Sequence, residues 1–340
     1  MSVRSLAREA EVSPMTVSLA LRDHPRISLA MREKIRALAA RLGHVPNPRL
    51  GELMNEVRRG RRPELHAAIG LISLYPRSDA THYTPHLALS VRGARVRAEQ
   101  LGYRIDDFWL GAPGMNPRRF RQILETRDIR GLLCLGAYEF DIPLPNELHS
   151  FAVVALGMSI RTRVHRVVSS HHRDAYTLLQ ILRERGYVRP GLITQPEWEM
   201  RSDHGYTSAY LLFQDRVLGG ARFPVLRLPE FDGAVVTQWL KRYEPDVVII
   251  HQPPAFFRAF EAMAAAAGLS VPRDLGTVFL GVDPHSDDYA GMAQNHERIG
   301  ICGLELLVGR MQQRAFGLPD VPKIEFVEGT WVEGRTVRPR

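Results

Sequence analysis

The spacing of apolar residues along this 340-residue chain changes once, near residue 67. Before that point apolar residues recur at intervals of three and four, which is the period of helices with one buried face. After it, short apolar runs alternate with helical stretches. The pattern therefore predicts a small helical head followed by a larger body of alternating strands and helices.

The head predicts three short helices that can bury a core only against one another. The apolar face of the first is formed by Val3, Leu6, Ala7 and Ala10. Ser13 is a good N-cap and Pro14 suits a first helical position, so a second helix begins there. Ser28 caps the third helix and Gly43 ends it. A short exposed helix after a tight turn is typical of the helix-turn-helix, whose second helix enters the major groove of DNA.

The body predicts parallel sheets covered by helices on both faces. Its strand-like runs are 67–75, 103–110, 131–136, 151–157, 165–170, 189–194, 223–229, 245–251 and 276–282. The helical stretches between most of them are 87–101, 117–127, 173–185, 205–218, 233–242, 255–267 and 296–316. Alternation of this kind, with about nine strands, indicates an α/β body of two doubly wound lobes. A ligand is then expected beyond the carboxyl ends of the strands, in the cleft between the lobes.

The distribution of charge along the chain indicates the kind of partner that the head binds. Of the formal net charge of +8, residues 1–62 hold +7, from thirteen Arg and Lys against six Asp and Glu. A compact basic head on a nearly neutral body is the electrostatic footprint of a protein that binds a polyanion. A basic face that is merely solvated is the alternative.

Other compositional features point to a cytoplasmic protein. The chain has no apolar run of 18 residues that would span a membrane, and its N-terminus lacks the apolar segment of a secretory signal. Its two cysteines, Cys134 and Cys302, each stand in an apolar run. We expect both to be buried free thiols of a reducing compartment.

A dense set of residues in the head matches a known family pattern. They are Leu6-Ala7, Ala10, Val12-Ser13, Thr16-Val17-Ser18, Leu21, Ile27-Ser28, Arg32, Leu42-Gly43 and Pro46-Asn47. Through them the head resembles the N-terminal domain of the LacI/GalR family of bacterial transcription regulators. The body resembles the family's effector domain, of the type I periplasmic-binding-protein fold, in "LRERGYVRPGLIT" and "AAAAGLSVPRDLGTVFLGVD". The resemblance runs from Val3 to about Thr336.

The resemblance implies which residues contact DNA. The family's base-reading positions fall on Pro14, Met15 and Leu19. Met15 and Leu19 cannot make bidentate hydrogen bonds to a base, so they contact thymine methyl groups or leave specificity to other residues and to DNA shape. The candidate DNA-binding residues are Ser13, Pro14, Met15, Thr16, Ser18, Leu19, Arg22, Asn47 and Leu53.

Leu53 belongs to a segment that follows the head. Residues 48–59 predict a short amphipathic helix, with Leu50, Leu53, Met54 and Val57 on one face. In the resembled family this hinge folds on DNA, pairs with its twin in a dimer and inserts a leucine into the minor groove, which kinks the duplex. Counting from Pro46-Asn47 assigns that leucine to Leu53, and a role in dimer packing alone is the alternative.

The family's effector-binding positions transfer to this chain unevenly. Asp283 matches an aspartate that accepts sugar hydroxyls in the family, and a family ligand loop reads Thr84-Pro85-His86-Leu87 here. The family's arginine falls on Ser202, next to Arg201, and its asparagine is absent, with Gln252 nearby. The candidate effector-binding residues are His86, Arg201, Ser202, Gln252 and Asp283. Altered or lost effector binding is the alternative.

Together these features predict a homodimeric, nucleoid-associated repressor of carbohydrate-metabolism genes that binds a pseudo-palindromic operator and a sugar-like effector. Residues 1–46 form the DNA-binding domain and 47–65 the hinge and linker. Residues 66–340 form the effector and dimerisation domain, with lobes divided near 165–170 and 283–295. A sugar-binding protein without a regulatory role is the alternative, against which the basic head argues.

No enzyme, cofactor or metal site is predicted. The chain has no P-loop, no G-x-S-x-G, no H-E-x-x-H and no paired C-x-x-C motif. Residues 283–288 gather acidic groups and a histidine, but a loop of this kind after a strand is more typical of a turn. Residues 169–176 hold adjacent histidines, which point apart on a helix.

Overall fold

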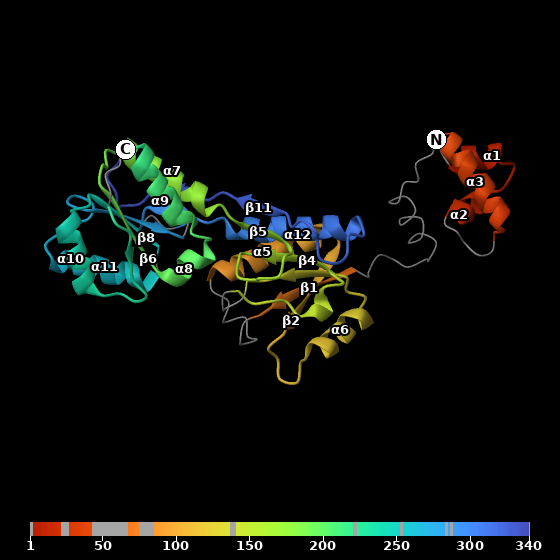
Figure 1. The fold of residues 1–340 in the computed structure, drawn as a ribbon, viewed down its shortest axis with the longest axis horizontal. Helices are drawn as coiled ribbons and strands as arrows, with labels where there is room; N and C mark the ends of the chain where they lie inside the picture. Colours follow the sequence, from red (N-terminus) through yellow and green to blue (C-terminus); the bar gives the residue numbers. More distant parts are fainter. Residues whose placement is uncertain are drawn as a thin grey trace. The chain divides into compact units, whose positions relative to one another are not determined.

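The chain folds into two compact units, residues 1–65 and residues 66–340. The computed structural model (Figure 1) describes residues 3–21, 27–42, 67–74, 85–136, 141–219, 223–251, 254–282, 285 and 288–339. In these segments no helix is both long enough and apolar enough to cross a membrane. The predicted hinge helix, residues 48–59, lies outside the described segments.

The head consists of three helices, as the sequence predicts: α1 (Val3–Glu9), α2 (Pro14–Leu21) and α3 (Leu29–Arg41). Their apolar faces form one core, in which Leu6, Val17 and Ile35 have no exposed surface. Both predicted caps are present. The Ser13 hydroxyl accepts a hydrogen bond of 3.0 Å from the Thr16 backbone N–H, and the Ser28 hydroxyl accepts one of 3.4 Å from Met31. Each cap satisfies a backbone donor that the first turn of a helix leaves unpaired.

The first lobe of the body is built on a sheet of six parallel strands in the order β11-β5-β4-β3-β1-β2. They are β1 (Ala67–Ser73), β2 (Tyr103–Trp109), β3 (Gly131–Cys134), β4 (Ala152–Leu156), β5 (His165–Ser169) and β11 (Ile324–Val327). One face packs on α5 (Pro85–Gln100) and α12 (His296–Gln312). The other packs on α6 (Pro117–Thr126) and the 3-10 turn at Asn146–Leu148.

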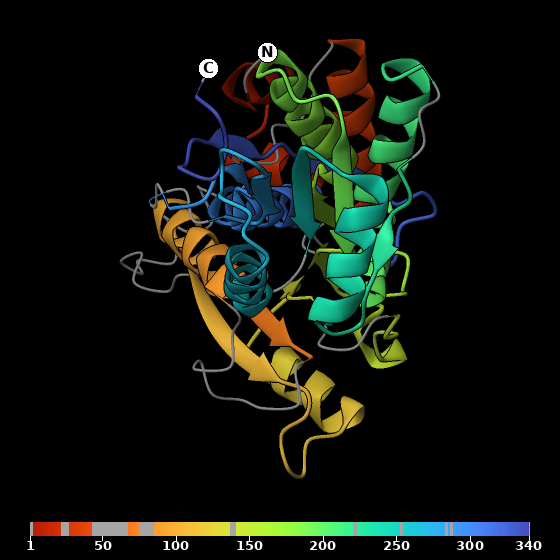
Figure 2. The ribbon, with the colours of Figure 1, turned by 90° about the vertical axis from the view of Figure 1, so that its left-hand side faces the viewer.

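The second lobe repeats the plan with the strand order β12-β10-β9-β8-β6-β7. Its strands are β6 (Pro190–Thr194), β7 (Leu226–Arg227), β8 (Val247–His251), β9 (Gly276–Leu280), β10 (Gly291–Ala293) and β12 (Thr330–Val332), of which β12 runs antiparallel to β10. One face packs on α7 (His171–Glu184) and α9 (Gly205–Arg216). The other face of this sheet packs on α10 (Gly233–Tyr243) and α11 (Pro254–Ala266). Figures 1 and 2 show the two layers of helices on either side of the sheet.

The chain passes between the lobes at three places. The first is Ser170, between β5 and α7, and the second is Gln294-Asn295, between β10 and α12. The third, Glu328-Gly329 between β11 and β12, is additional to those expected from the sequence. Each lobe is therefore completed by segments distant in sequence from its other strands.

The predicted fold class is confirmed, with a few elements missed or shortened. The strands β10, β11 and β12 and the helix α8 (Pro196–Arg201) were not predicted, because three to six residues are too few to show a period. The predicted strand 223–229 is reduced to β7, a two-residue strand at the sheet edge. The predicted helix 296–316 ends at Gln312, and Arg314 then adopts a left-handed backbone conformation with φ 55°.

The two cysteines differ in exposure. Cys134 is a fully buried free thiol in β3, and burial raises its pKa to about 12. Cys302 is also a free thiol but is only partly buried, so the expectation of full burial is wrong for this residue. It lies on α12, where it packs at the edge of the core instead of within a strand.

The helices α5 and α12 approach each other until their backbones touch. A side-chain carbon at Gly300 would collide with the carbonyl oxygen of Ser90, and one at Gly93 would collide with the carbonyl oxygen of Glu297. Glycine at both positions therefore allows the close contact. This contact fixes the start of α12 relative to the start of α5.

Candidate functional site

The predicted DNA-reading surface lies on α2. Ser13 and Pro14 are exposed at its start, Met15 is 56% exposed, and Thr16 and Leu19 are half-buried. The Ser13 and Thr16 hydroxyls lie 2.9 Å apart. Ser18 belongs to the same helix, whereas Arg22, Asn47 and Leu53 lie outside the described residues. The exposed face of α2 thus offers one apolar side chain and two hydroxyls, a set that can contact thymine methyl groups and phosphates.

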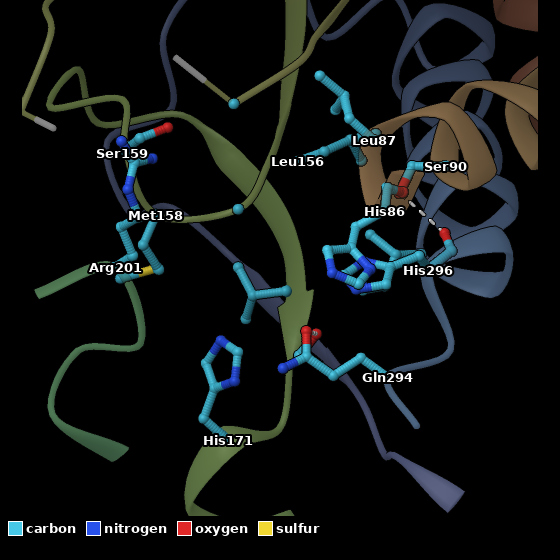
Figure 3. A pocket seen from close by; sticks show the side chains of 15 residues that line it. His86, Leu87, Ser90, Leu156, Met158, Ser159, His171, Arg201, Gln294 and His296 are labelled. Carbon is cyan, nitrogen blue, oxygen red and sulfur yellow. Dashed lines mark hydrogen bonds between the residues drawn. The ribbon is translucent and has the colours of Figure 1, made fainter. Parts of the chain in front are cut away.

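The body holds a cavity of about 200 Å³ at the carboxyl ends of the first-lobe strands (Figure 3). Its wall comes from α5, from the segments after β3, β4, β5 and β10, and from the starts of α7 and α12. Arg201 of α8 contributes from the second lobe. The position is the one expected for a ligand of a doubly wound fold.

Three imidazoles face this cavity. His86 lies in the first turn of α5, and His171 and His296 are the first residues of α7 and α12. The His86 and His296 rings stack with centroids 4.7 Å apart and planes tilted by 32°. Burial, reinforced by neighbouring histidines, lowers the pKa of His171 and of His296 to about 3, and burial lowers that of His86. All three are therefore neutral at neutral pH.

A directed chain of hydrogen bonds orients His171. The Ser169 hydroxyl donates to the Gln294 side-chain oxygen (3.2 Å), and Gln294 Nε2 donates to the Tyr206 hydroxyl oxygen (2.6 Å). That hydroxyl lies 2.8 Å from His171 Nδ1. We assign the proton of the neutral His171 ring to Nε2, so that Nδ1 accepts the proton of the Tyr206 hydroxyl and the series of hydrogen bonds runs in one direction. His171 Nε2–H is then left as a donor toward the cavity, where Figure 3 shows the ring.

A second buried cluster supports Tyr206 from behind. The His251 ring lies against the Tyr206 ring with centroids 4.3 Å apart. The Thr194 hydroxyl bonds both Glu199 (3.1 Å) and His251 Nδ1 (3.2 Å). Burial lowers the pKa of His251 despite the nearby Glu199. Burial alone raises the pKa of Glu199, but hydrogen bonds from His251 and Thr194 outweigh it and hold that pKa below its usual value.

The predicted effector residues meet this cavity only in part. His86 and Arg201 line it, and Arg201 pairs with Glu197 at 3.1 Å. Ser202 does not line it, because its side chain is buried and its hydroxyl donates to the Glu199 carbonyl oxygen at 3.0 Å. Of the two neighbours, Arg201 is the one that lines the cavity. Gln252 and Asp283 lie outside the described residues.

Sequence reasoning missed His171, Tyr206, Gln294 and His296. A usable signal was present for two of them. His171 and His296 each follow a strand within three residues and open a helix, a position at the ligand-binding edge of a parallel sheet. In the described segments no group of three His, Cys, Asp or Glu side chains is arranged to hold a metal ion.

Comparison with known proteins identifies the head directly. Residues 2–47 match the family model described as bacterial regulatory proteins of the lacI family. The HTH-type transcriptional repressor CytR of Escherichia coli strain K12 is 23% identical over 330 residues, which cover 93% of this chain and 91% of CytR.

Solved structures share the complete two-unit plan. A complex of the transcriptional regulator CelR with cellobiose aligns with a TM-score of 0.57 at 21% identity, covering 99% of both chains. The lac repressor dimer bound to operator and the anti-inducer ONPF aligns with a TM-score of 0.58 at 18% identity, covering 100% of this chain and 99% of that one.

The comparisons cover both parts of the chain. The family model matches the helix-turn-helix head, and the likeness to CytR continues through the two-lobed body that holds the cavity. The order of head and body is also that of the lac repressor structure. Residues 2–47 therefore match the lacI family of bacterial regulatory proteins, and the whole chain is similar to CytR and shares its fold with CelR and the lac repressor.

Proposed function

We propose that this protein is a transcription repressor that binds operator DNA as a homodimer and releases it, or binds it more tightly, when a small sugar-like molecule enters the cavity. The observation that carries the proposal is one chain's combination of a basic helix-turn-helix head with a two-lobed ligand-binding body. The family model describes regulatory proteins, so we assign no catalytic role. The site of action is the chromosome in the bacterial cytoplasm.

The head supplies the DNA contacts in this proposal. Met15 and Leu19 approach thymine methyl groups in the major groove, and Ser13, Thr16, Ser18 and Arg22 bind phosphates or base edges. Two heads read two half-sites of a pseudo-palindromic operator, as dimeric helix-turn-helix proteins do. Asn47 and the Leu53 wedge extend the contact into the minor groove.

The cavity supplies the control. Its wall includes residues from both lobes, with Gln294 in one joining segment and Ser169 and His171 on either side of another. A ligand that favours one angle between the lobes changes the arrangement of the dimer and hence its operator affinity. A coupling free energy of roughly 1–3 kcal/mol, which changes affinity about 5- to 150-fold, is sufficient for such control.

Selection of bound sequences from random DNA with the full-length protein tests the proposal. We expect a palindrome of two short half-sites, bound with an affinity that falls steeply as salt rises, because phosphate contacts release counterions. No enrichment of any sequence, or an affinity that does not change with salt, would contradict the assignment.

A substitution in the hinge tests the wedge. We expect Leu53→Ala to weaken binding to the selected operator more than binding to unrelated DNA, because only the specific complex contains the kinked step. Competition binding assays with the two DNAs measure the ratio. An equal loss of affinity for the operator and for unrelated DNA would contradict the wedge role and favour a role for Leu53 in dimer packing alone.

A further inference from the structure

Three long helices begin at the cavity, and each places a histidine in its first turn. They are α5, α7 and α12, of 16, 14 and 17 residues, with His86, His171 and His296. We propose that the effector carries an anionic group, a carboxylate or a phosphate, that binds between His171 and the His86–His296 pair while that pair takes up one proton from solvent. The inference rests on the proposed function, since it assigns the ligand class of the same cavity.

The first support is the direction of the donors. We assign the His171 proton to Nε2, because Nδ1 then accepts from the Tyr206 hydroxyl at the end of the Ser169–Gln294–Tyr206 series of hydrogen bonds, and in this tautomer the ring offers an N–H to the cavity. Arg201 adds a guanidinium from the second lobe. The helix N-termini add positive potential, which favours an anion at this position.

The second support is the placement of the acids. Of the described residues that line the cavity, none is Asp or Glu. The carboxylates nearby are engaged elsewhere: Glu197 with Arg201, Glu199 with Thr194 and His251, Asp174 with the Gly329 N–H, and Glu297 with Arg92. The described wall therefore presents donors with no carboxylate to repel an anion.

The third support is the His86–His296 pair. Among the described residues neither imidazole makes a hydrogen bond, and the two rings contact each other. An anion beside them offsets the burial that keeps them neutral, so protonation becomes favourable on binding. Two stacked rings repel as a doubly charged pair, so the pair takes up a single proton.

His171 does not take up the proton. An imidazolium at this position would have to donate from Nδ1 to the Tyr206 oxygen, which already accepts from Gln294. The Tyr206 proton would then lose its acceptor in a buried site, where an unpaired donor is unfavourable. His171 is thus the fixed neutral donor, and the stacked pair carries the charge.

Histidine NMR on the full-length protein tests this with inorganic phosphate, acetate and glucose as probes. At about pH 6 we expect phosphate or acetate to move the His86 or His296 Cε1–H resonance toward the imidazolium position, and glucose to leave it in place. The response to phosphate compared with acetate distinguishes the two anion types. For one proton taken up, the apparent dissociation constant should rise about tenfold per pH unit.

His296→Gln is expected to abolish the response at His86. The matched control is His172→Gln, next to His171 on α7, because the His172 ring bonds Ser208 and does not line the cavity. Resonances of His86 and His296 that stay still with both anions, or move no more than that of His172, overturn the proposal. This measurement on the unmodified protein decides the matter even if a variant fails to fold.

The selected operator separates this inference from the proposed function. If neutral sugars alter operator binding while sugar acids and sugar phosphates do not, the regulator assignment stands and the anionic effector is wrong. If no operator can be selected, the regulator assignment fails, whatever the histidine resonances show.

Discussion

At the scale of single residues, the cavity depends on one hydroxyl. The Tyr206 side chain is 1% exposed, and its hydroxyl accepts from Gln294 and, in the assigned tautomer, donates to His171 Nδ1. A hydroxyl can do both at once, which no aliphatic or purely accepting side chain can. The donor-to-acceptor direction of the whole series of hydrogen bonds from Ser169 to His171 depends on this oxygen atom.

Tyr206→Phe is expected to lower the free energy of unfolding by about 1–3 kcal/mol, because buried polar partners lose their bonds. It should also free His171 to exchange its proton between the two ring nitrogens, which the ¹⁵N shifts of the ring report. Tyr210→Phe is the matched control, since Tyr210 lies one turn later and donates to the Pro190 carbonyl. A similar change in the His171 ring in both variants would contradict the role of Tyr206.

Asp174 contributes a pH dependence of stability. Burial raises the pKa of this carboxyl to about 6, although the Gly329 N–H donates to it at 2.7 Å. The folded protein therefore holds the proton more tightly than the unfolded chain, in which the pKa is 3.8. The free energy of unfolding should fall as the pH rises from about 4 to about 6 and stay low above that range.

Asp174→Asn is expected to flatten this part of the profile and to raise stability near neutral pH by about 1–2 kcal/mol. Urea unfolding at a series of pH values measures it. Asp128→Asn, at a side chain that is 80% exposed, is the control and should keep the original profile. If the free energy of unfolding of Asp174→Asn depends on pH as that of the unmodified protein does, groups other than Asp174 cause the dependence.

At the scale of elements, the crossing of α5 and α12 positions two of the three imidazoles. The backbone contacts at Gly93 and Gly300 hold the start of α12 against α5, and the Ser90 hydroxyl donates to the His296 carbonyl oxygen at 3.0 Å. The stacked His86 and His296 rings are a consequence of that crossing. The distance between these rings is thus controlled by residues that do not touch the cavity.

Gly300→Ala is expected to lower the free energy of unfolding by about 1–3 kcal/mol, because the added carbon forces the helices apart. Gly309→Ala on the same helix meets open space and should stabilise the protein by about 0.5–1 kcal/mol through helix propensity. Thermal unfolding of the two variants measures both shifts. Equal effects would mean that the helices separate without strain.

The elements with long periodic patterns were predictable, and the cavity was not. Helices such as α5, α7 and α12 and strands such as β1 and β8 follow from apolar spacing, because burial acts on each turn or alternate residue. The cavity depends on residues 86, 171 and 296 meeting in space, which no local pattern encodes. Of the predicted neighbours Arg201 and Ser202, only Arg201 lines the cavity, because one step along the chain turns the Ser202 side chain into the core.

At the scale of the whole molecule, head and body are separate compact units with separate cores. The head buries a few side chains around Leu6, Val17 and Ile35, whereas the body has four larger clusters. All four tryptophans belong to the body, at positions 109, 198, 239 and 331. Tryptophan fluorescence therefore reports the body alone.

Ile35→Ala is expected to destabilise the head by about 2–4 kcal/mol, because it leaves a cavity in a small core. Operator binding and part of the helical circular dichroism should be lost, while the tryptophan fluorescence and its thermal transition stay unchanged. A shift of the fluorescence transition would show that the two units unfold together.

Two of the crossings between the lobes lie at the cavity wall. Ser169 and His171 lie on either side of the crossing at Ser170. Gln294 lies within the crossing at Gln294-Asn295, and His296 follows it. Under the proposed function, a molecule in the cavity touches residues at these crossings directly. We therefore expect substitutions that change which molecule fits to change the angle between the lobes as well. Ligand preference and regulatory strength would then change together in evolution.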